Sequence, residues 1–261
     1  MPHSATLLRY DLVNKKGVIP KSPSKQRQLH ALYFVLASEE EILKLALRSL
    51  VCHCPALTSI HIVMDKDRPL TPDGQHEVCQ LFPTVQFQVS RYKMAWGGPG
   101  FMISKLEALR KIYPLLRSDD YLISLDPDVL IYDKIVFDQV LGSRENTIGH
   151  KVQPHQNRGN NAYMQGGCYF LSTKAVRHVI EANLSLAMWK VGYLTRLWIP
   201  NCPEDFLISE ITKNLSRRYL DYMSLAPERD PRRSVLHFTE GNKLSRMRNF
   251  LKKYDKLISN I

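Results

Sequence analysis

The 261-residue chain contains no apolar run of the roughly 18 residues that a membrane-spanning helix needs. Its N-terminus has neither the apolar segment nor the small-residue cleavage site of a secretory signal, so we expect a cytoplasmic protein. The five cysteines are odd in number and scattered, which favours a reducing compartment over a disulfide framework. No internal repeat or low-complexity segment is present.

Acidic residues are fewer than basic ones, 25 against 36, so the formal net charge is +11 and the pI is near 9.4. Such a balance indicates acidic partners: nucleic acid, an anionic membrane surface or phosphorylated substrates. Much of the excess follows Lys213, and the sequence shows neither a recognition-helix motif nor aromatics interleaved with basic residues. We therefore expect no nucleic-acid partner, and a basic nucleic-acid-binding protein is kept only as an alternative.

The hydrophobic content of 44% supports one sizeable core, and the sequence pattern divides the chain into three parts. Residues 1–28 are a polar, basic lead-in segment, residues 29–242 the domain proper, and residues 243–261 a basic amphipathic helix. Within the domain, strands predicted at 30–37, 58–65, 84–90 and 120–125 alternate with helices predicted at 38–51, 72–82 and 104–116. Ser38 is expected to cap the first helix. This alternation predicts an α/β fold with a mostly parallel central sheet, flanked by helices, that binds ligands beyond the carboxyl ends of its strands.

The C-terminal segment, residues 243–261, carries apolar residues at three- and four-residue spacing, with basic residues at most other positions. Two interpretations stay open. The helix either packs on the domain or lies on an anionic membrane surface near a lipid-linked acceptor.

The stretch YLISLDPDVLIYD, residues 121–133, is an apolar run that ends at Asp126 and admits a second acid at Asp128 before turning apolar again. Asp65 also follows a predicted strand. Carboxylates at such a strand end can bind a hard divalent cation, Mn²⁺ or Mg²⁺, that also grips a diphosphate. In the alternative, Asp126 and Asp128 form only a turn whose bend is set by Pro127.

This motif and its context resemble the Asp-x-Asp site of GT-A-type glycosyltransferases, and the resemblance covers most of the chain. It implies a nucleotide-sugar donor, most simply a UDP-sugar, and an acceptor hydroxyl on a glycan, glycolipid or glycoprotein. The matching segments assign a nucleotide or donor contact to Ala37, Ser38 and Lys105, and we add Asp65 from its place at a strand end. In YMQGGCYFLSTKAV, the resemblance implies that Gly166 and Gly167 leave room for the sugar and that Gln165 hydrogen-bonds its hydroxyls.

The late segment VLHFTEGNK is similar to one in the glycogenin and lipopolysaccharide galactosyltransferase group. The similarity implies that His237 is the third metal ligand and that the Gly241 amide and Lys243 hold the diphosphate. The spacing departs from that group, with three residues rather than two between His237 and Gly241 and one rather than two before Lys243.

The segment CPEDFLISEI resembles the acidic helix start that faces donor and acceptor in the fold. A carboxylate there can act as general base toward the acceptor hydroxyl, and we expect Asp205 in this role, with Glu204 as second choice. An opposed base implies inversion at the anomeric carbon. A retaining transferase of the same fold is the alternative, because the group with the late His, Gly, Lys segment retains configuration.

Other interpretations were weighed against these. The Asp-x-Asp stretch also resembles the first motif of haloacid-dehalogenase-type phosphatases, with Asp126 as nucleophile and Asp128 as acid, but that motif normally opens its domain. A nucleotidyltransferase would need a glycine-rich first loop, which is absent after residues 33–37. Lys105 could be an ordinary surface lysine, His237 a satisfied core histidine, and the Glu204-Asp205 pair only a complement to the helix dipole.

Overall fold

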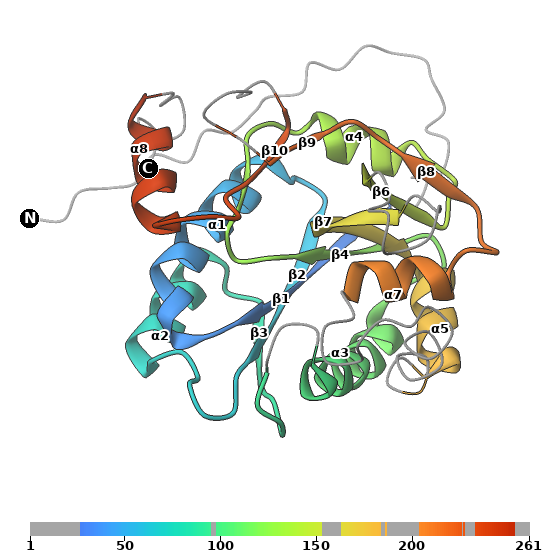
Figure 1. Cartoon of the computed structure of the whole chain (residues 1–261), viewed down its shortest axis with the longest axis horizontal. Coiled ribbons are helices and arrows are strands. Elements are labelled where there is room, and N and C mark those ends of the chain that lie inside the picture. The colour runs from blue at the N-terminus through green and yellow to red at the C-terminus, as the bar shows by residue number, and fades with distance from the viewer. Residues whose placement is uncertain are drawn as a thin grey trace, which may run out of the picture.

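The computed structural model describes residues 27–94, 98–152, 163–183, 186, 204–225, 227 and 233–253. Within this part, a seven-stranded sheet in the order β3-β2-β1-β4-β7-β6-β8 forms the centre of the molecule (Figure 1). Its strands are β1 (Leu29–Val35), β2 (Leu57–Met64), β3 (Val85–Val89), β4 (Tyr121–Leu125), β6 (Thr147–Val152), β7 (Tyr163–Ser172) and β8 (Arg217–Tyr219).

The sheet is mostly parallel, as the sequence predicts. Strands β3, β2, β1 and β4 pair in parallel, and β6 pairs in parallel with β8. Strand β7 is the exception, because it runs antiparallel to both β4 and β6. Strand β1 is buried at every residue, which fits an apolar sequence covered on both faces at the centre of a sheet.

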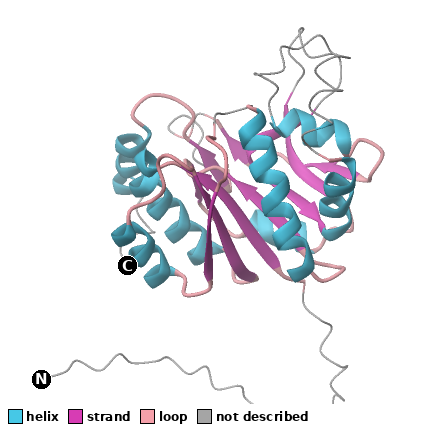
Figure 2. Cartoon of the chain, turned by 90° about the horizontal axis from the view of Figure 1, so that it is seen from below, coloured by secondary structure: helices cyan, strands magenta, loops and turns pink. Residues whose placement is uncertain are grey.

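Figure 2 shows the sheet between helices on its two faces. One face packs against α1, α2 and α4, and the other packs against α3, α5 and α7, so each face has its own apolar cluster. These helices are α1 (Glu40–His53), α2 (Pro72–Leu81), α3 (Pro99–Ile112), α4 (Ile135–Leu141), α5 (Thr173–Ala182) and α7 (Glu204–Ile211).

Two predicted helix starts are wrong. Ser38 does not cap α1: it lies in a short 3-10 helix, Ala37–Glu39, and α1 begins at Glu40 without a side-chain cap. The Glu39 carboxylate instead accepts the backbone N–H of Leu36 at 2.9 Å, which ties the end of β1 to the helix start. Helix α3 begins at Pro99, five positions before the predicted start, because proline suits the first turn of a helix, where its missing N–H is not needed.

A second, three-stranded sheet in the order β5-β10-β9 adjoins the main one. Helix α8 (Lys243–Lys253) packs on it and on α1, and it buries Met247, Phe250 and Leu251 against Leu130, Leu236 and Phe238. This part of the C-terminal segment therefore docks on the domain. The strands of this sheet are β5 (Val129–Ile131), β9 (Met223–Ser224) and β10 (Val235–His237).

Candidate active site

Asp126 and Asp128 lie at the point where the chain leaves the main sheet and enters the small one. Asp126 directly follows β4, and its backbone N–H donates to the carbonyl of Gly167 at 2.9 Å. Asp128 directly precedes β5, which pairs antiparallel with β10 so that Val129 lies opposite His237. The pairing of two short strands thus brings a late histidine beside two acids from the middle of the chain.

These three side chains converge. His237 Nε2 lies 3.2 Å from Asp128 Oδ1 and 3.7 Å from Asp126 Oδ2. One ligand atom from each residue can be chosen so that all three lie within 4.8 Å of one another. Asp128 and His237 are buried, while the Asp126 side chain keeps 22% of its surface exposed. Two carboxylates and an imidazole with one open side form a donor set that suits Mn²⁺ or Mg²⁺.

The polar atoms of this cluster are not all satisfied by protein. Among the described residues, Asp128 Oδ1 and His237 Nδ1 are buried without a hydrogen-bond partner. A buried carboxylate oxygen without a partner costs free energy that coordination of a cation would recover. The residues present therefore fit a divalent metal.

The three groups also perturb one another. Burial raises the pKa of Asp126 to about 7, and the nearby His237 offsets only part of this effect. Burial alone would raise the pKa of Asp128 as well, but the neighbouring His237 and Lys243 outweigh it and hold this pKa below its usual range. Burial opposes protonation of His237, yet the two carboxylates raise its pKa. Such strongly shifted pKa values are typical of functional sites.

Lys243 contacts this cluster, and Gly241 lies two positions before it in the chain. Lys243 Nζ lies 2.5 Å from Asp128 Oδ2, and this side chain is 33% exposed. Gly241 has φ +66, a left-handed conformation that favours glycine and lets the chain turn into α8. The Asn242 side chain then caps the helix by accepting the N–H of Ser245 at 3.1 Å.

Packing within the protein explains why β7 carries glycine at positions 166 and 167, independently of the predicted sugar contact. A Cβ atom at Gly167, where φ is +89, would lie 2.5 Å from the His237 ring. A Cβ atom at Gly166 would lie 3.1 Å from Asp205 Oδ2. The absent side chains therefore make room for two protein side chains, and Gln165 lies beside them, partly exposed.

Asp205 lies in the first turn of α7 and faces β7. Its Oδ2 accepts the N–H of Gly166 at 2.7 Å, and its Oδ1 accepts the N–H of Phe206 at 2.8 Å. Through the neighbouring glycines, Asp205 and His237 approach the same two-residue stretch of β7. Asp205 therefore contacts Gly166, the residue next to the glycine that packs against His237.

Glu204 is less suited to the predicted role of second-choice base, because its carboxylate is buried in an ion pair. It pairs with the Lys105 ammonium and accepts the hydroxyl of Tyr169. Lys105 is only 1% exposed and donates to Ser124 Oγ at 2.8 Å, so it is not a surface lysine. Its ammonium also lies 5.2 to 5.9 Å from the ring centres of Phe34, Phe101 and Tyr169. The pair joins α3 to the start of α7, close enough to Asp126 for both charges to act on its carboxylate.

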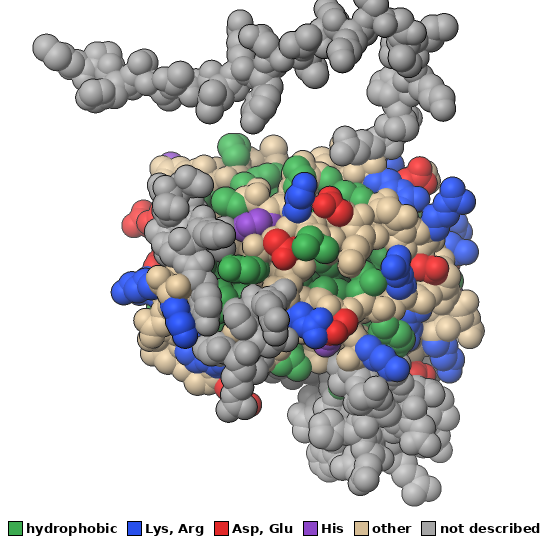
Figure 3. Space-filling view, turned by 90° about the horizontal axis from the view of Figure 1, so that it is seen from above, with side chains coloured by type: hydrophobic (Ala, Val, Ile, Leu, Met, Phe, Trp, Pro, Cys, Tyr) green, Lys and Arg blue, Asp and Glu red, His purple; other side chains and the backbone are tan. Residues whose placement is uncertain are grey.

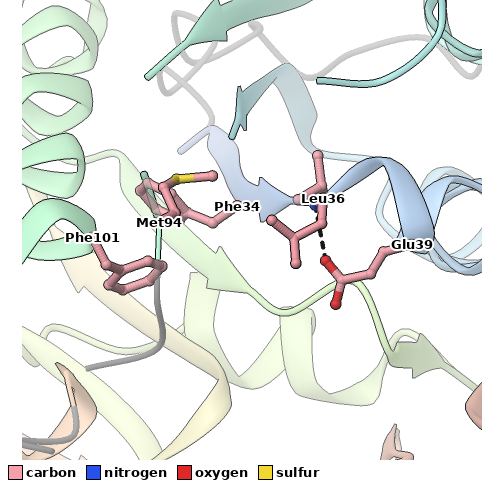
Figure 4. A pocket seen from close by; sticks show the side chains of 6 residues that line it. Phe34, Leu36, Glu39, Met94 and Phe101 are labelled. Atoms are coloured by element: carbon pink, nitrogen blue, oxygen red, sulfur yellow. Dashed lines mark hydrogen bonds between the residues drawn. The ribbon is translucent and has the colours of Figure 1, made fainter. Parts of the chain in front are cut away.

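A pocket opens at the end of β1, next to Ala37 and Ser38. Figure 4 shows Phe34, Met94 and Phe101 gathered at one end and Glu39 at the other. Asp65, which the sequence predicted to contact the donor, holds the pocket residue Met94 in place: its Oδ2 accepts the N–H of Met94 at 2.6 Å. Its Oδ1 accepts two further backbone N–H groups, those of Asp67 and Arg68.

The pocket residues Phe34, Glu39, Met94 and Phe101 were not predicted. Glu39 is one of three successive acids, 39–41, that look like an ordinary first helical turn. Met94 comes from the connection between β3 and α3, and Phe101 from the first turn of α3, which the sequence pattern did not predict. Only Phe34 belongs to an element that the pattern predicted, the first strand.

No protein-family model matches this chain, and no curated protein matches it. Solved structures do resemble it. The galactosyltransferase LgtC, in complex with donor and acceptor sugar analogues, gives a TM-score of 0.60 at 10% identity over 86% of this chain and 95% of its own. The bifunctional glycosyltransferase WbbM gives 0.56 at 10% identity, over 90% of this chain and 51% of its own. The glycosyltransferase GlyE of Streptococcus pneumoniae TIGR4 gives 0.54 at 11% identity, over 86% and 60%.

This chain thus spans nearly the whole LgtC structure, about half of the WbbM chain and three fifths of the GlyE chain. The likeness establishes its fold, that of GT-A-type glycosyltransferases, and confirms the predicted fold class. The haloacid-dehalogenase alternative loses its basis, because the Asp-x-Asp motif follows the fourth strand of this fold rather than opening a domain.

Proposed function

We propose that the protein is a metal-dependent glycosyltransferase that moves a sugar from a nucleoside-diphosphate donor, a UDP-sugar, to a hydroxyl of a glycan, glycolipid or glycoprotein. The observation that carries the proposal is the convergence of Asp126, Asp128 and His237 at the strand ends of a GT-A sheet. The similar structures bear the names of glycosyltransferases, which supports the same reaction class. Fold alone would not, because function depends on the site.

The three converging side chains would hold Mn²⁺ or Mg²⁺. When bound, the cation would supply the positive charge that stabilises a departing nucleoside diphosphate. Lys243, which pairs with Asp128, and the N–H of Gly241, two positions earlier in the chain, would bind the phosphate oxygens. The pocket at Ala37, Ser38 and Glu39, which is lined by apolar side chains from β1 and α3, would accept the base.

Asp205 is the proposed general base, and the proposed outcome is inversion. The role is assigned to Asp205 because it lies at the start of α7, where the helix dipole favours a negative charge, and because it contacts Gly166, next to the residue that packs against His237. The buried pair of Lys105 and Glu204 would hold the start of α7, and thereby Asp205, in position. Gln165 and the two glycines would border the sugar and the acceptor.

One observation favours the retaining alternative. Both oxygens of Asp205 already accept backbone N–H groups, those of Gly166 and Phe206, so this carboxylate has a structural role. A carboxylate used in this way could orient β7 without removing a proton. We keep retention as the second candidate on this ground.

A thermal-shift screen of nucleotide sugars, each with and without Mn²⁺, tests the function. A bound donor stabilises the folded state by mass action, so the correct donor should raise Tm by several degrees only when Mn²⁺ is present. Asp128→Asn should abolish this shift, whereas Asp138→Asn, at an exposed position on α4, should keep it. A metal-independent shift, or an unchanged one in Asp128→Asn, would refute the metal site.

Proton NMR of the first-formed product tests the stereochemistry. With the donor found in the screen, inversion should appear directly in the anomeric coupling, and Asp205→Asn should lose about 10²- to 10⁴-fold in kcat. Retained configuration, or near wild-type turnover of Asp205→Asn, would instead favour the second candidate and leave the metal site untouched.

The proposed location is the cytoplasm, with any membrane contact peripheral. Among the described residues, no helix is both long and apolar enough to cross a bilayer.

The apolar side of α8 is buried against the domain, so a contact with anionic lipid would depend on the basic residues Arg248, Lys252 and Lys253. On the face in Figure 3, Lys and Arg are interspersed with Asp and Glu. Vesicle flotation at low and high salt tests this contact.

A further inference from the structure

The Lys243 ammonium pairs with Asp128 in this structure, although its proposed role is to bind the diphosphate of the donor. Its ammonium lies 2.5 Å from Asp128 Oδ2, while the other oxygen, Oδ1, lies 3.2 Å from His237. A lysine so placed neutralises a carboxylate that the proposed function assigns to the cation. The same ammonium cannot give its full charge both to Asp128 and to a diphosphate.

The backbone of Lys243 is anchored in a helix, whereas its side chain is partly exposed. Lys243 is the first residue of α8, which is anchored by Met247, Phe250 and Leu251 and capped by Asn242. The lysine side chain is one third exposed, in contrast to the nearly buried Asp128. Rotation of a long side chain can therefore move the ammonium without moving the helix.

We propose that Lys243 competes with the divalent cation for Asp128 and is drawn off by the diphosphate of the donor, so that cation and diphosphate bind cooperatively through this one residue. This inference rests on the proposed function and adds how its site is regulated.

The physical cause is the repulsion between two positive charges that share one carboxylate. Without a diphosphate, the ammonium stays on Asp128 and weakens binding of a cation to the same group. A diphosphate offers the ammonium other oxygens, which frees Asp128 at the moment when the cation is needed. Coupling between two ligands is reciprocal, so the cation should strengthen diphosphate binding by the same factor.

The test compares Lys243→Met with wild type and with Lys252→Met, a control on the same helix. Calorimetry measures the affinity for Mn²⁺ alone, and then for UDP, with GDP in parallel, at low and at saturating Mn²⁺. Lys243→Met should bind Mn²⁺ alone about tenfold more tightly, within the usual range of coupling between sites, and its coupling between Mn²⁺ and UDP should shrink by a similar factor. Lys243→Arg, which keeps the charge, should bind Mn²⁺ alone as weakly as wild type.

Unchanged affinity of Lys243→Met for Mn²⁺ would overturn the inference, and the metal site would stand. Weaker binding of Mn²⁺ would also overturn it, since Lys243 would then only orient Asp128. If neither wild type nor any variant binds Mn²⁺, with or without UDP or GDP, the proposed function fails together with the inference.

Discussion

Gly167 shows how one residue can position two of the three side chains proposed to bind a metal. Its backbone carbonyl accepts the N–H of Asp126, and its missing side chain leaves the space that the His237 ring fills. Its φ of +89 is also a conformation that residues with a Cβ atom avoid. One glycine therefore adjusts the positions of two of the three proposed ligands.

We expect Gly167→Ala to lose most of its Mn²⁺ affinity and to be destabilised by about 1–3 kcal/mol, because the new Cβ would overlap the imidazole and strain the backbone. Gly166→Ala is the matched comparison: its Cβ would meet the Asp205 carboxylate instead, so Mn²⁺ binding should survive. Calorimetry and urea unfolding measure both effects. Equal Mn²⁺ affinity in the two variants would contradict this account.

At the residue scale, the sequence allowed prediction of the acids and the late histidine, but not of their partners. Asp126 and Asp128 interrupt an apolar run, which is visible in one dimension. The burial of Lys105 against Glu204 is not visible there, because the two charges look like surface residues on separate helices. Their pairing depends on how α3 and α7 cross the same face of the sheet, which only the tertiary structure determines.

Among the elements, α8 is the one most closely tied to the candidate site. It packs on β5, which follows Asp128, and on β10, which ends at His237. Phe250 is central to this contact, with its ring 5.9 Å from that of Tyr132 and 6.0 Å from that of Phe238. The helix thus supports the small sheet that presents two of the proposed metal ligands.

Phe250→Ala should therefore reduce stability by about 3–5 kcal/mol, since it removes a buried aromatic side chain and leaves a cavity. Mn²⁺ binding should weaken in the same variant, because β5 and β10 lose their support. Lys252→Ala, on the same turn of helix, should change neither quantity beyond the error. Urea unfolding and calorimetry decide, and full Mn²⁺ affinity in a destabilised Phe250→Ala would separate α8 from the site.

The predicted bounds of the helices agree best with the structure where the apolar periodicity is strong, and least where a helix starts directly after a turn. The spacing of apolar residues in α1 and α8 is regular: α1 lies within two residues of its predicted bounds, and α8 begins at the predicted residue, while residues 254–261 of the predicted helix lie outside the described residues. The start of α3 at Pro99 was missed because a Pro-Gly sequence usually indicates a loop. The left-handed turn at Gly241 was not predicted.

At the scale of the whole molecule, strand direction was the main feature beyond prediction. Alternating strands and helices indicate parallel crossovers, and β1 to β4 follow this rule. Strand β7 reverses it, and this reversal pairs Cys168 with Leu125 and so brings the preceding Gly167 beside Asp126. No periodicity in the sequence encodes a direction, which is set by connections and packing.

A polar cluster lies among the first strands of the sheet. His30 Nδ1 lies 2.8 Å from Ser59 Oγ, which lies 3.0 Å from His61 Nε2, and all three side chains are buried. Burial lowers the pKa of His61 to about 4, with a further contribution from His30, and burial also lowers the pKa of His30 despite the nearby Asp120. Both imidazoles are therefore held neutral in the folded protein at neutral pH.

This cluster predicts an acid-sensitive fold. In the unfolded chain His61 has its ordinary pKa near 6.5, so between pH 6.5 and pH 4 the unfolded state binds more protons and stability falls as the pH falls. For His61 alone, the loss between pH 7 and pH 5 is about 2 kcal/mol. His61→Gln should reduce the pH dependence of the free energy of unfolding by that amount, whereas His76→Gln, at an exposed position on α2, should not. Urea unfolding of the three proteins at pH 7 and pH 5 measures the difference. An equal pH dependence in wild type and His61→Gln would mean that His61 is already protonated in the folded protein, or titrates alike in both states.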